Sequence, residues 1–177
     1  MNTVKYNTLS ANPETEACEL KNHIGETIRL HGAVYKIRRM SGFAFVLIRM
    51  RDAIVQSVYS EKFASFPLNL LAEEACVRLT AQVVAEERSR TGYELRLMEA
   101  QVLSAPCEEL PIVINQKKVN TSLENLLDYR PVTLRNEKER AIFRIQAAIC
   151  TAFREFLNRE HFTEIHSPKS AEQQIKT

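Results

Sequence analysis

One short segment combines aromatic and basic side chains in the way that binding of single-stranded nucleic acid requires. Phe43 and Phe45 stand two positions apart, and residues 27–51 hold no acidic side chain but six basic ones, Arg29, Lys36, Arg38, Arg39, Arg49 and Arg51. Aromatic rings stack on bases while cationic groups hold the phosphate backbone. The rings are equally compatible with packing in a barrel or an interface, and the charges with a solvated strand face.

Two polar side chains further along could complete a surface that reads bases. Gln56 follows Phe45 by eleven positions, and its amide could hydrogen-bond to the edge of a base. The carboxylate of Glu94, on the outward side of a later strand pattern, could accept a hydrogen bond from a base amino or imino group. We expect no metal site in this chain, because no standard zinc spacing fits Cys150, His161, Glu164 and His166. We expect no catalytic residue, because the local sequence suggests no Ser-His-Asp or Cys-His arrangement.

The segments that carry these residues show the two-residue alternation of half-buried strands. This alternation predicts five strands, near residues 27–38, 43–50, 53–59, 77–83 and 93–98. Gly32 lies inside the first strand, where an interior glycine predicts a bulge or a bend. Residues 61–75 predict a helical connection that Pro67 shortens or kinks. Three strands, a helix and two strands is the order of the OB-fold, so we predict a mainly β fold with α, built on a five-stranded Greek-key barrel.

The C-terminal part predicts a hinge followed by one long amphipathic helix. Asn136 can cap a helix, and Glu139 stands three residues on to complete a capping box. A helix of about 24 residues then ends near His161, with apolar side chains at helical spacing on one face, at Ile142, Ile145, Ile149, Phe153 and Phe156. Only one side of the barrel is large enough within the chain to cover that face.

These patterns divide the chain into four parts. Residues 1–20 are a polar extension with a short helix near residues 14–20, and residues 21–110 are the barrel domain. Residues 111–135 are a polar, irregular hinge, and residues 136–177 begin a second, incomplete domain.

Composition and charge exclude several other classes of protein. The chain has 177 residues, of which 45% are apolar and 26% charged, as in an ordinary globular protein. No run approaches the ~18 consecutive apolar residues of a membrane span, and the polar start is not a secretory signal. The four cysteines lie far apart, so we expect reduced thiols in a cytoplasmic protein. The net charge of +2 is small, and only the local basic segment indicates a nucleic-acid partner.

Several short motifs follow one another along the chain: Gly32-Ala33-Val34, Arg38, residues 45–52 (FVLIRMRD), Ile54-Val55-Gln56, residues 74–77 (EACV), residues 92–95 (GYEL) and Leu110-Pro111-Ile112. In type and order they resemble the anticodon-binding domain of class II aspartyl-tRNA synthetases. Residues 127–135 resemble the hinge to the catalytic domain, residues 141–157 that domain's first long helix, and residues 162–168 motif 1, the dimer element that ends in Pro168. The resemblance covers about 145 positions, which makes it specific.

The resemblance implies a role for four residues and a partner. Phe45 corresponds to the phenylalanine that stacks on the central anticodon base, a uridine, and Gln56 to the residue that hydrogen-bonds to the same base. Arg38 corresponds to an anticodon-contacting arginine, and Glu94 to an acidic residue that helps to read the first anticodon base. The implied partner is therefore tRNA, bound through an anticodon stem-loop with a central U. Phe43 has no such counterpart and is interpreted as packing.

The resemblance also implies the activity of the whole enzyme, which is ATP-dependent attachment of aspartate to tRNA by a homodimer that uses ATP and Mg²⁺. Residues 1–177 reach nine residues past motif 1 and hold neither of the two arginine motifs that complete the ATP site. We therefore expect no cofactor in this chain, and no aminoacylation by this chain alone.

Departures from the family pattern leave other interpretations open. Ala53 replaces a glycine that usually follows Arg-Asp, and Ala33 stands where Arg or Trp is common. The alternatives are a free-standing OB-fold paralogue that binds nucleic acid in trans, a fragment of an asparaginyl-tRNA synthetase, and a structural protein that dimerises through the long helix and motif 1. Asparaginyl- and lysyl-tRNA synthetases share the barrel and the central uridine, so these two features do not distinguish the cognate amino acid.

Overall fold

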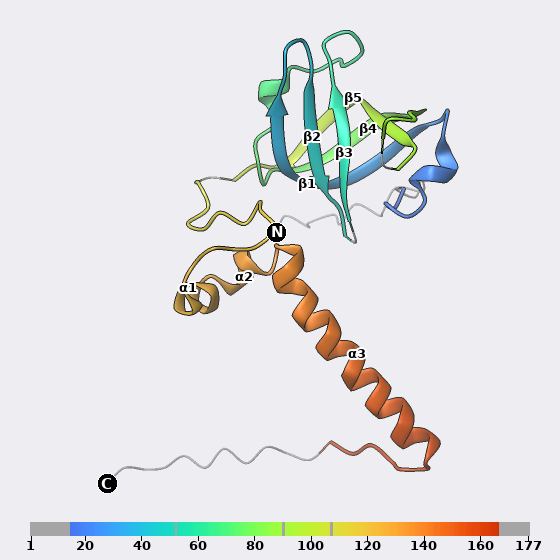
Figure 1. The fold of residues 1–177 in the computed structure, drawn as a ribbon, viewed down its shortest axis with the longest axis vertical. Helices are drawn as coiled ribbons and strands as arrows, with labels where there is room; N and C mark the ends of the chain where they lie inside the picture. Colours follow the sequence, from blue (N-terminus) through green and yellow to red (C-terminus); the bar gives the residue numbers. More distant parts are fainter. Residues whose placement is uncertain (1–14, 52, 90, 107, 167–177) are drawn as a thin grey trace, which may run out of the picture. The chain divides into compact units, whose positions relative to one another are not determined.

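The computed structural model describes residues 15–51, 53–89, 91–106 and 108–166. The chain divides into two compact units, Met1–Glu109 and Leu110–Thr177. The strands lie in the first unit and the α-helices in the second (Figure 1). Among the described residues, no helix is long and apolar enough to cross a membrane.

Five strands of the first unit close into a barrel, as the sequence predicts. They are β1 (Thr27–Arg39), β2 (Ala44–Arg49), β3 (Ile54–Tyr59), β4 (Cys76–Ala85) and β5 (Tyr93–Ser104). Their order around the barrel is β1-β2-β3-β5-β4, and only the β3–β5 pair is parallel (Figure 1). This mainly β arrangement with helices is the predicted OB-fold.

Alternate residues of each strand fill the barrel, because successive side chains of a strand point to opposite faces. The interior is aliphatic, and its fully buried members include Leu30, Val34, Val46, Ile48, Val77, Leu79, Leu95 and Leu97. Ser57 is also fully buried, and its hydroxyl donates a hydrogen bond of 2.7 Å to the Val46 carbonyl, so no donor is left unpaired there. The outward residues of β1, β2 and β3 are consequently available to a ligand.

The curvature of β1 allows it to pair with two strands, and Gly32 stands where the partner changes. β1 pairs with β4 from Thr27 to Ala33 and with β2 from Ala33 to Arg39. A Cβ atom on Gly32 would lie 2.5 Å from the Arg49 carbonyl oxygen, so only glycine permits this close approach. The bulge itself lies between Val34 and Lys36. Gly32 is therefore required for the close approach of β1 to β2 and not for the bulge.

The predicted helix over residues 61–75 is wrong. This connection contains only the single 3-10 turn η2 (Leu68–Leu70), preceded by Pro67. Pro67 lacks an N–H and disfavours helical backbone at the residue before it. The apolar side chains that suggested a helix, Phe66 and Leu71, instead enter the barrel core from an irregular segment.

The short helix predicted near residues 14–20 also differs from the structure. The observed element is the 3-10 turn η1 (Leu20–His23), which no side chain caps. Leu20 is fully buried in the barrel core and anchors this turn.

At the β2–β3 turn, the sequence has Ala53 where the family usually has glycine. The Met50 N–H donates to the Ala53 carbonyl, and Ala53 is not among the described residues with positive φ, so alanine is tolerated there.

The second unit has more structure than the predicted irregular hinge. Two short helices, α1 (Leu123–Asp128) and α2 (Arg130–Thr133), precede α3 (Glu137–Arg159). Ile112, Ile114 and Val119 form a small separate core, against which pack the half-buried Leu110, Leu126 and Val132. The prediction underestimated this segment because its apolar residues follow no regular period.

Asn136 caps α3, as predicted, but its own N–H donates to the Thr133 carbonyl and not to the Glu139 side chain of the predicted capping box. The Asn136 side chain also ties the helix to the preceding loop. Its Oδ1 accepts hydrogen bonds from the backbone of Lys138 and Glu139, at 3.0 and 3.4 Å. Its Nδ2 donates to the carbonyls of Ile114 and Gln116, at 2.9 and 2.7 Å. The side chain is buried, and both of its polar ends are satisfied.

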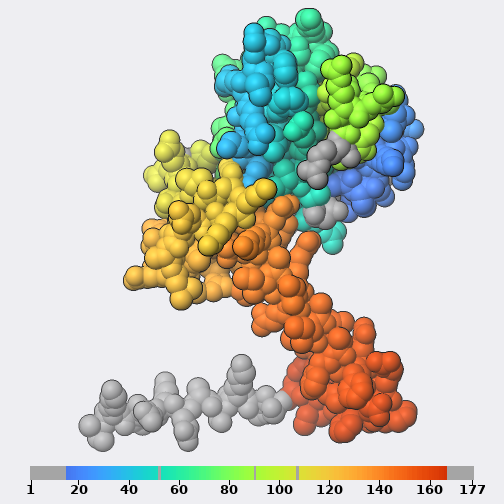
Figure 2. Space-filling view, viewed as in Figure 1, coloured from blue at the N-terminus to red at the C-terminus, as the bar shows by residue number. Residues whose placement is uncertain are grey.

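The apolar face of α3 lies open in this unit. The five predicted side chains are between 52% and 64% exposed, namely Ile142, Ile145, Ile149, Phe153 and Phe156. The space-filling view likewise shows the orange-red half of this helix with no other described part of the unit over its visible face (Figure 2).

Candidate nucleic-acid interface

The first two site residues are direct neighbours on the outer face of the barrel. Arg38 of β1 pairs with Phe45 of β2, and Phe45 pairs in turn with Val58 of β3. The row continues into β5, where Val58 pairs with Arg96. Paired residues of adjacent strands share one face of a sheet. An exposed guanidinium therefore stands beside a half-buried ring, whose other side is backed by the buried Val58.

The other two site residues lie on the same face, one pleat along. Gln56 is exposed and pairs with Leu47, which pairs with Lys36. Gln56 precedes Val58 by two positions, and Glu94 precedes Arg96 by two positions on the parallel partner strand. The register consequently gathers Arg38, Phe45, Gln56 and Glu94 on the outer face of β1, β2, β3 and β5.

Phe43 occupies the edge of this face and supports Phe45. The two ring centroids are 5.2 Å apart with an interplanar angle of 89°, an edge-to-face geometry typical of favourable aromatic pairs. Phe43 is 39% exposed and belongs to neither core cluster. Its packing is therefore against the neighbouring ring at the surface, and not inside the barrel.

Glu94 is held by a neighbouring cation. The Nε atom of Arg96 lies 3.4 Å from Glu94 Oε1, and the two side chains are 43% and 26% exposed. This contact keeps a carboxylate oriented on the outer face while leaving its remaining lone pairs to a ligand. Beside it, burial raises the pKa of Tyr93, with a side-chain hydrogen bond to Thr91 acting in the opposite direction, so this phenol is neutral near pH 7.

Arg49 does not contribute a free cation to the basic segment. Its guanidinium makes two hydrogen bonds to the Glu74 carboxylate, at 2.8 and 2.7 Å, and the two side chains are only 10% and 4% exposed. The backbone N–H of Glu74 donates to Val34 of β1, which joins β1, β2 and the β3–β4 connection at one point. The positive charge available on this face comes instead from Lys36 and Arg38, while Arg96 is paired with Glu94.

Sequence reasoning did not single out three residues of this surface: Leu47, Val58 and Arg96. The alternation along β2 already places Leu47 beside Phe45, so this signal was present. Val58 joins the row through the antiparallel β2–β3 register, and Arg96 joins it only through the parallel β3–β5 register, which the local sequence pattern does not reveal.

The remaining predicted position is Pro168, at the end of the motif 1 resemblance, and it lies outside the described residues. Within the residues that the structure describes, no group of three or more His, Cys, Asp or Glu side chains is placed to hold a metal ion.

Comparison with known proteins matches both units of the chain. Residues 122–176 match the family model for class II tRNA synthetases of the D, K and N group. The aspartate–tRNA(Asp/Asn) ligases of Deinococcus radiodurans and Thermus thermophilus are each 36% identical to this chain over 151 residues, which is 85% of it. The chain spans about a third of their length, 33% and 34% respectively.

Solved structures agree with this assignment. The aspartyl-tRNA synthetase from Entamoeba histolytica superposes with a TM-score of 0.77 at 26% identity, over 90% of this chain and 40% of that one. The asparaginyl-tRNA synthetase from Pyrococcus horikoshii, complexed with asparaginyl-adenylate, gives a TM-score of 0.76 at 29% identity, over 88% of this chain and 36% of that one. Barrel, helix and sequence identity thus agree, and the chain belongs to the class II tRNA synthetases of the aspartate, lysine and asparagine group.

Proposed function

We propose that this chain recognises the anticodon of tRNA, as part of an aspartate–tRNA ligase. The observation that carries the proposal is the register across β1, β2, β3 and β5, which gathers Arg38, Phe45, Gln56 and Glu94 on one outer face. That four residues assigned on separate strands share one face supports their assignment to a single binding surface. The relatives, which are named as aspartate–tRNA(Asp/Asn) ligases, supply the substrate class.

Each side chain has a separate task in this proposal. The Phe45 ring, held from the side by Phe43, stacks on the central uridine, and base–aromatic stacking is worth about 1–3 kcal/mol per base. The Gln56 amide, with one donor and one acceptor end, pairs with the uridine edge and distinguishes it from cytidine. Arg38 contacts the anticodon beside the stacked base, and Glu94, oriented by Arg96, accepts from the first anticodon base.

The site suits the two tRNAs in the relatives' names. In the genetic code, aspartate and asparagine anticodons share their first and second bases and differ in the third. The residues assigned to bases, Glu94, Phe45 and Gln56, address only the shared positions. The proposed site would therefore accept both tRNAs, and the asparaginyl-tRNA synthetase alternative would use the same surface.

The activity proposed for the full-length ligase is ATP-dependent attachment of aspartate to tRNA in the cytoplasm, by a homodimer that uses ATP and Mg²⁺. Pro168 of motif 1 is proposed to belong to the dimer interface. Residues 1–177 are proposed to bind tRNA without activating aspartate, since they span only about a third of the matched relatives.

Two measurements on the 177-residue chain test this proposal. Fluorescence anisotropy with labelled anticodon stem-loops should show salt-sensitive binding that is tighter for a central U than for a central C. Aspartate-dependent exchange of pyrophosphate into ATP should be absent. Equal affinity for both stem-loops would refute anticodon recognition, and measurable exchange would refute the assignment of this segment as binding only.

A further inference from the structure

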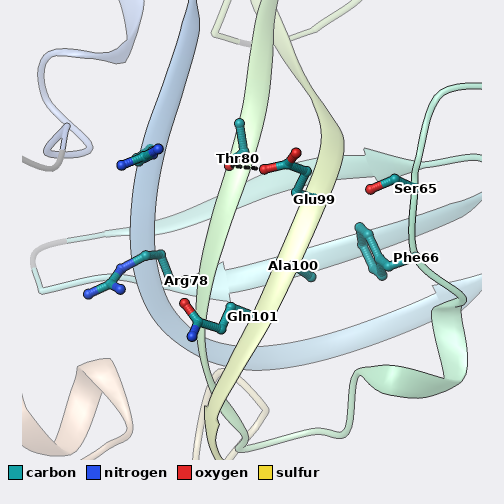
Figure 3. A pocket seen from close by; sticks show the side chains of 8 residues that line it. Ser65, Phe66, Arg78, Thr80, Glu99, Ala100 and Gln101 are labelled. Atoms are coloured by element: carbon teal, nitrogen blue, oxygen red, sulfur yellow. Dashed lines mark hydrogen bonds between the residues drawn. The ribbon is translucent and has the colours of Figure 1, made fainter.

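A groove opens on a different part of the barrel from the candidate interface. It has a volume of about 500 Å³ and lies over β1, β4, β5 and the β3–β4 connection. Eight residues line it: Arg29, Ser65, Phe66, Arg78, Thr80, Glu99, Ala100 and Gln101 (Figure 3). None of them belongs to β2 or to the four assigned anticodon positions.

A bulge in β5 shapes this groove. The β4–β5 register passes from Thr80↔Glu99 to Ala81↔Leu97, so Met98 is an extra residue on β5. Its carbonyl accepts two hydrogen bonds from Ser65, one from the backbone N–H at 2.8 Å and one from the hydroxyl at 2.9 Å. A bulge bends its strand and re-aims the neighbouring side chains. The groove is therefore built by fixed backbone contacts.

The register arranges its polar side chains in two rows across three strands. One row is Arg29, Thr80 and Glu99, and the other contains Arg78 and Gln101. The Thr80 hydroxyl donates to Glu99 Oε2 at 3.1 Å, which leaves the rest of the carboxylate as an acceptor. In the close view, Arg78 and Gln101 lie together at one end, and the Thr80–Glu99 pair lies at the other (Figure 3).

The charge of the groove indicates what it can bind. Its charged side chains are Arg29, Arg78 and Glu99, so the lining carries one net positive charge and favours an anion. Among the residues that the structure describes, the Arg29 guanidinium has neither an ion pair nor a side-chain hydrogen bond, whereas Arg96 on the other face is turned to Glu94. Glu99 can accept a further hydrogen bond from a donor close to the anion. A ribonucleotide supplies both, because its phosphate groups flank a 2′-hydroxyl that can donate.

We propose that this groove is a second RNA-binding site, in which Arg29 and Arg78 contact successive backbone phosphates and Glu99 accepts a hydrogen bond from a ribose 2′-hydroxyl. Arg29 and Arg78 stand diagonally across the β1–β4 pair, a separation of about 7–8 Å at the backbone that allows two separate phosphate contacts. The site depends on the proposed function only in taking RNA as its ligand.

The test uses a labelled oligoadenylate of about eight nucleotides, which fits the site size of one OB-fold and offers no uridine. The double variant Arg29→Gln/Arg78→Gln should bind it more weakly than the parent chain. Each phosphate contact on a single strand contributes about 0.7 to the slope of log Kd against log salt, so this slope should fall by about 1.4. Arg144→Gln/Arg159→Gln removes two exposed arginines of α3 and is the matched control, which should keep the parent slope.

The ribose contact is tested separately. The parent chain should prefer oligoadenylate to the DNA oligomer of the same length, and Glu99→Ala should bring that ratio close to one. An unchanged salt slope in the arginine variant, an equal loss in the matched control, or a ratio that Glu99→Ala leaves intact would overturn the proposal. Phe45→Leu separates this outcome from a failure of anticodon recognition, since it should weaken stem-loop binding without changing the oligoadenylate slope.

Discussion

At the scale of single residues, the contact between Phe43 and Phe45 determines how much the Phe43 ring should contribute to the free energy of unfolding. An edge-to-face aromatic pair contributes about 0.5–1.5 kcal/mol, whereas removing a phenylalanine from a core costs about 3–5 kcal/mol. Because Phe43 is 39% exposed, Phe43→Ala should lower the free energy of unfolding by the smaller amount. Urea denaturation followed by circular dichroism measures this, and a loss in the larger range would show that the ring is part of the core.

The Arg49–Glu74 pair belongs to the same scale and has a different energetic character. Its two hydrogen bonds lie almost out of solvent, so removing one partner leaves a buried charge unpaired. Arg49→Met should therefore destabilise the barrel by about 3–5 kcal/mol. The double variant Arg49→Met/Glu74→Met is the control and should recover most of that loss. If single and double variants were equally unstable, the charge pairing would not be the cause.

At the scale of elements, Asn136 joins α3 to the loop before it. Asn136→Ser keeps a neutral side-chain oxygen that can cap Lys138 and Glu139 but loses the amide that donates to Ile114 and Gln116. Asn136→Ala loses both. A missing cap costs about 0.5–2 kcal/mol, so the alanine variant should be less stable than the serine variant by about that amount. Thermal unfolding monitored at 222 nm compares the two, and identical midpoints would contradict a capping role.

The elements also show what a sequence can and cannot reveal. The five strands were predictable because one face of each is buried, which forces a two-residue alternation such as that of β2. The cap at Asn136 and the length of α3 were predictable because both depend on local contacts. The connection over residues 61–75 was not predictable, because the spacing of its apolar side chains depends on where they enter the barrel core and not on a helical period. The hinge helices α1 and α2 were missed because a small irregular core has no period.

The candidate site was predictable in a similar, partial way. Phe45 and Gln56 follow from strand pattern and family resemblance, and the structure places them on one face with Arg38 and Glu94. The Arg49–Glu74 pair was not predictable, since it joins residues 25 positions apart through a connection of irregular backbone. Arg96 likewise depends on the parallel pairing of β3 with β5.

At the scale of the whole molecule, the open face of α3 determines how the chain should behave in solution. Burial of each apolar side chain contributes about 1.5–3 kcal/mol, and five of them lie exposed on α3. The 177-residue chain should therefore associate as its concentration rises. Analytical ultracentrifugation tests this, with residues 1–135 as the control that should remain monomeric. A monomer at high concentration in both cases would contradict the expectation.

The central claim is that the outer face of β1, β2, β3 and β5 reads the anticodon, and two substitutions in the full chain test it most directly. Phe45→Leu keeps most of the apolar volume but removes the stacking ring, so binding of a central-U stem-loop should weaken by about 1–3 kcal/mol. Gln56→Ala should instead reduce the preference for U over C by about 1–3 kcal/mol and leave the affinity for C nearly unchanged. Fluorescence anisotropy with the two stem-loops measures both effects. If both variants bind and discriminate as the parent does, this face is not the anticodon-binding surface.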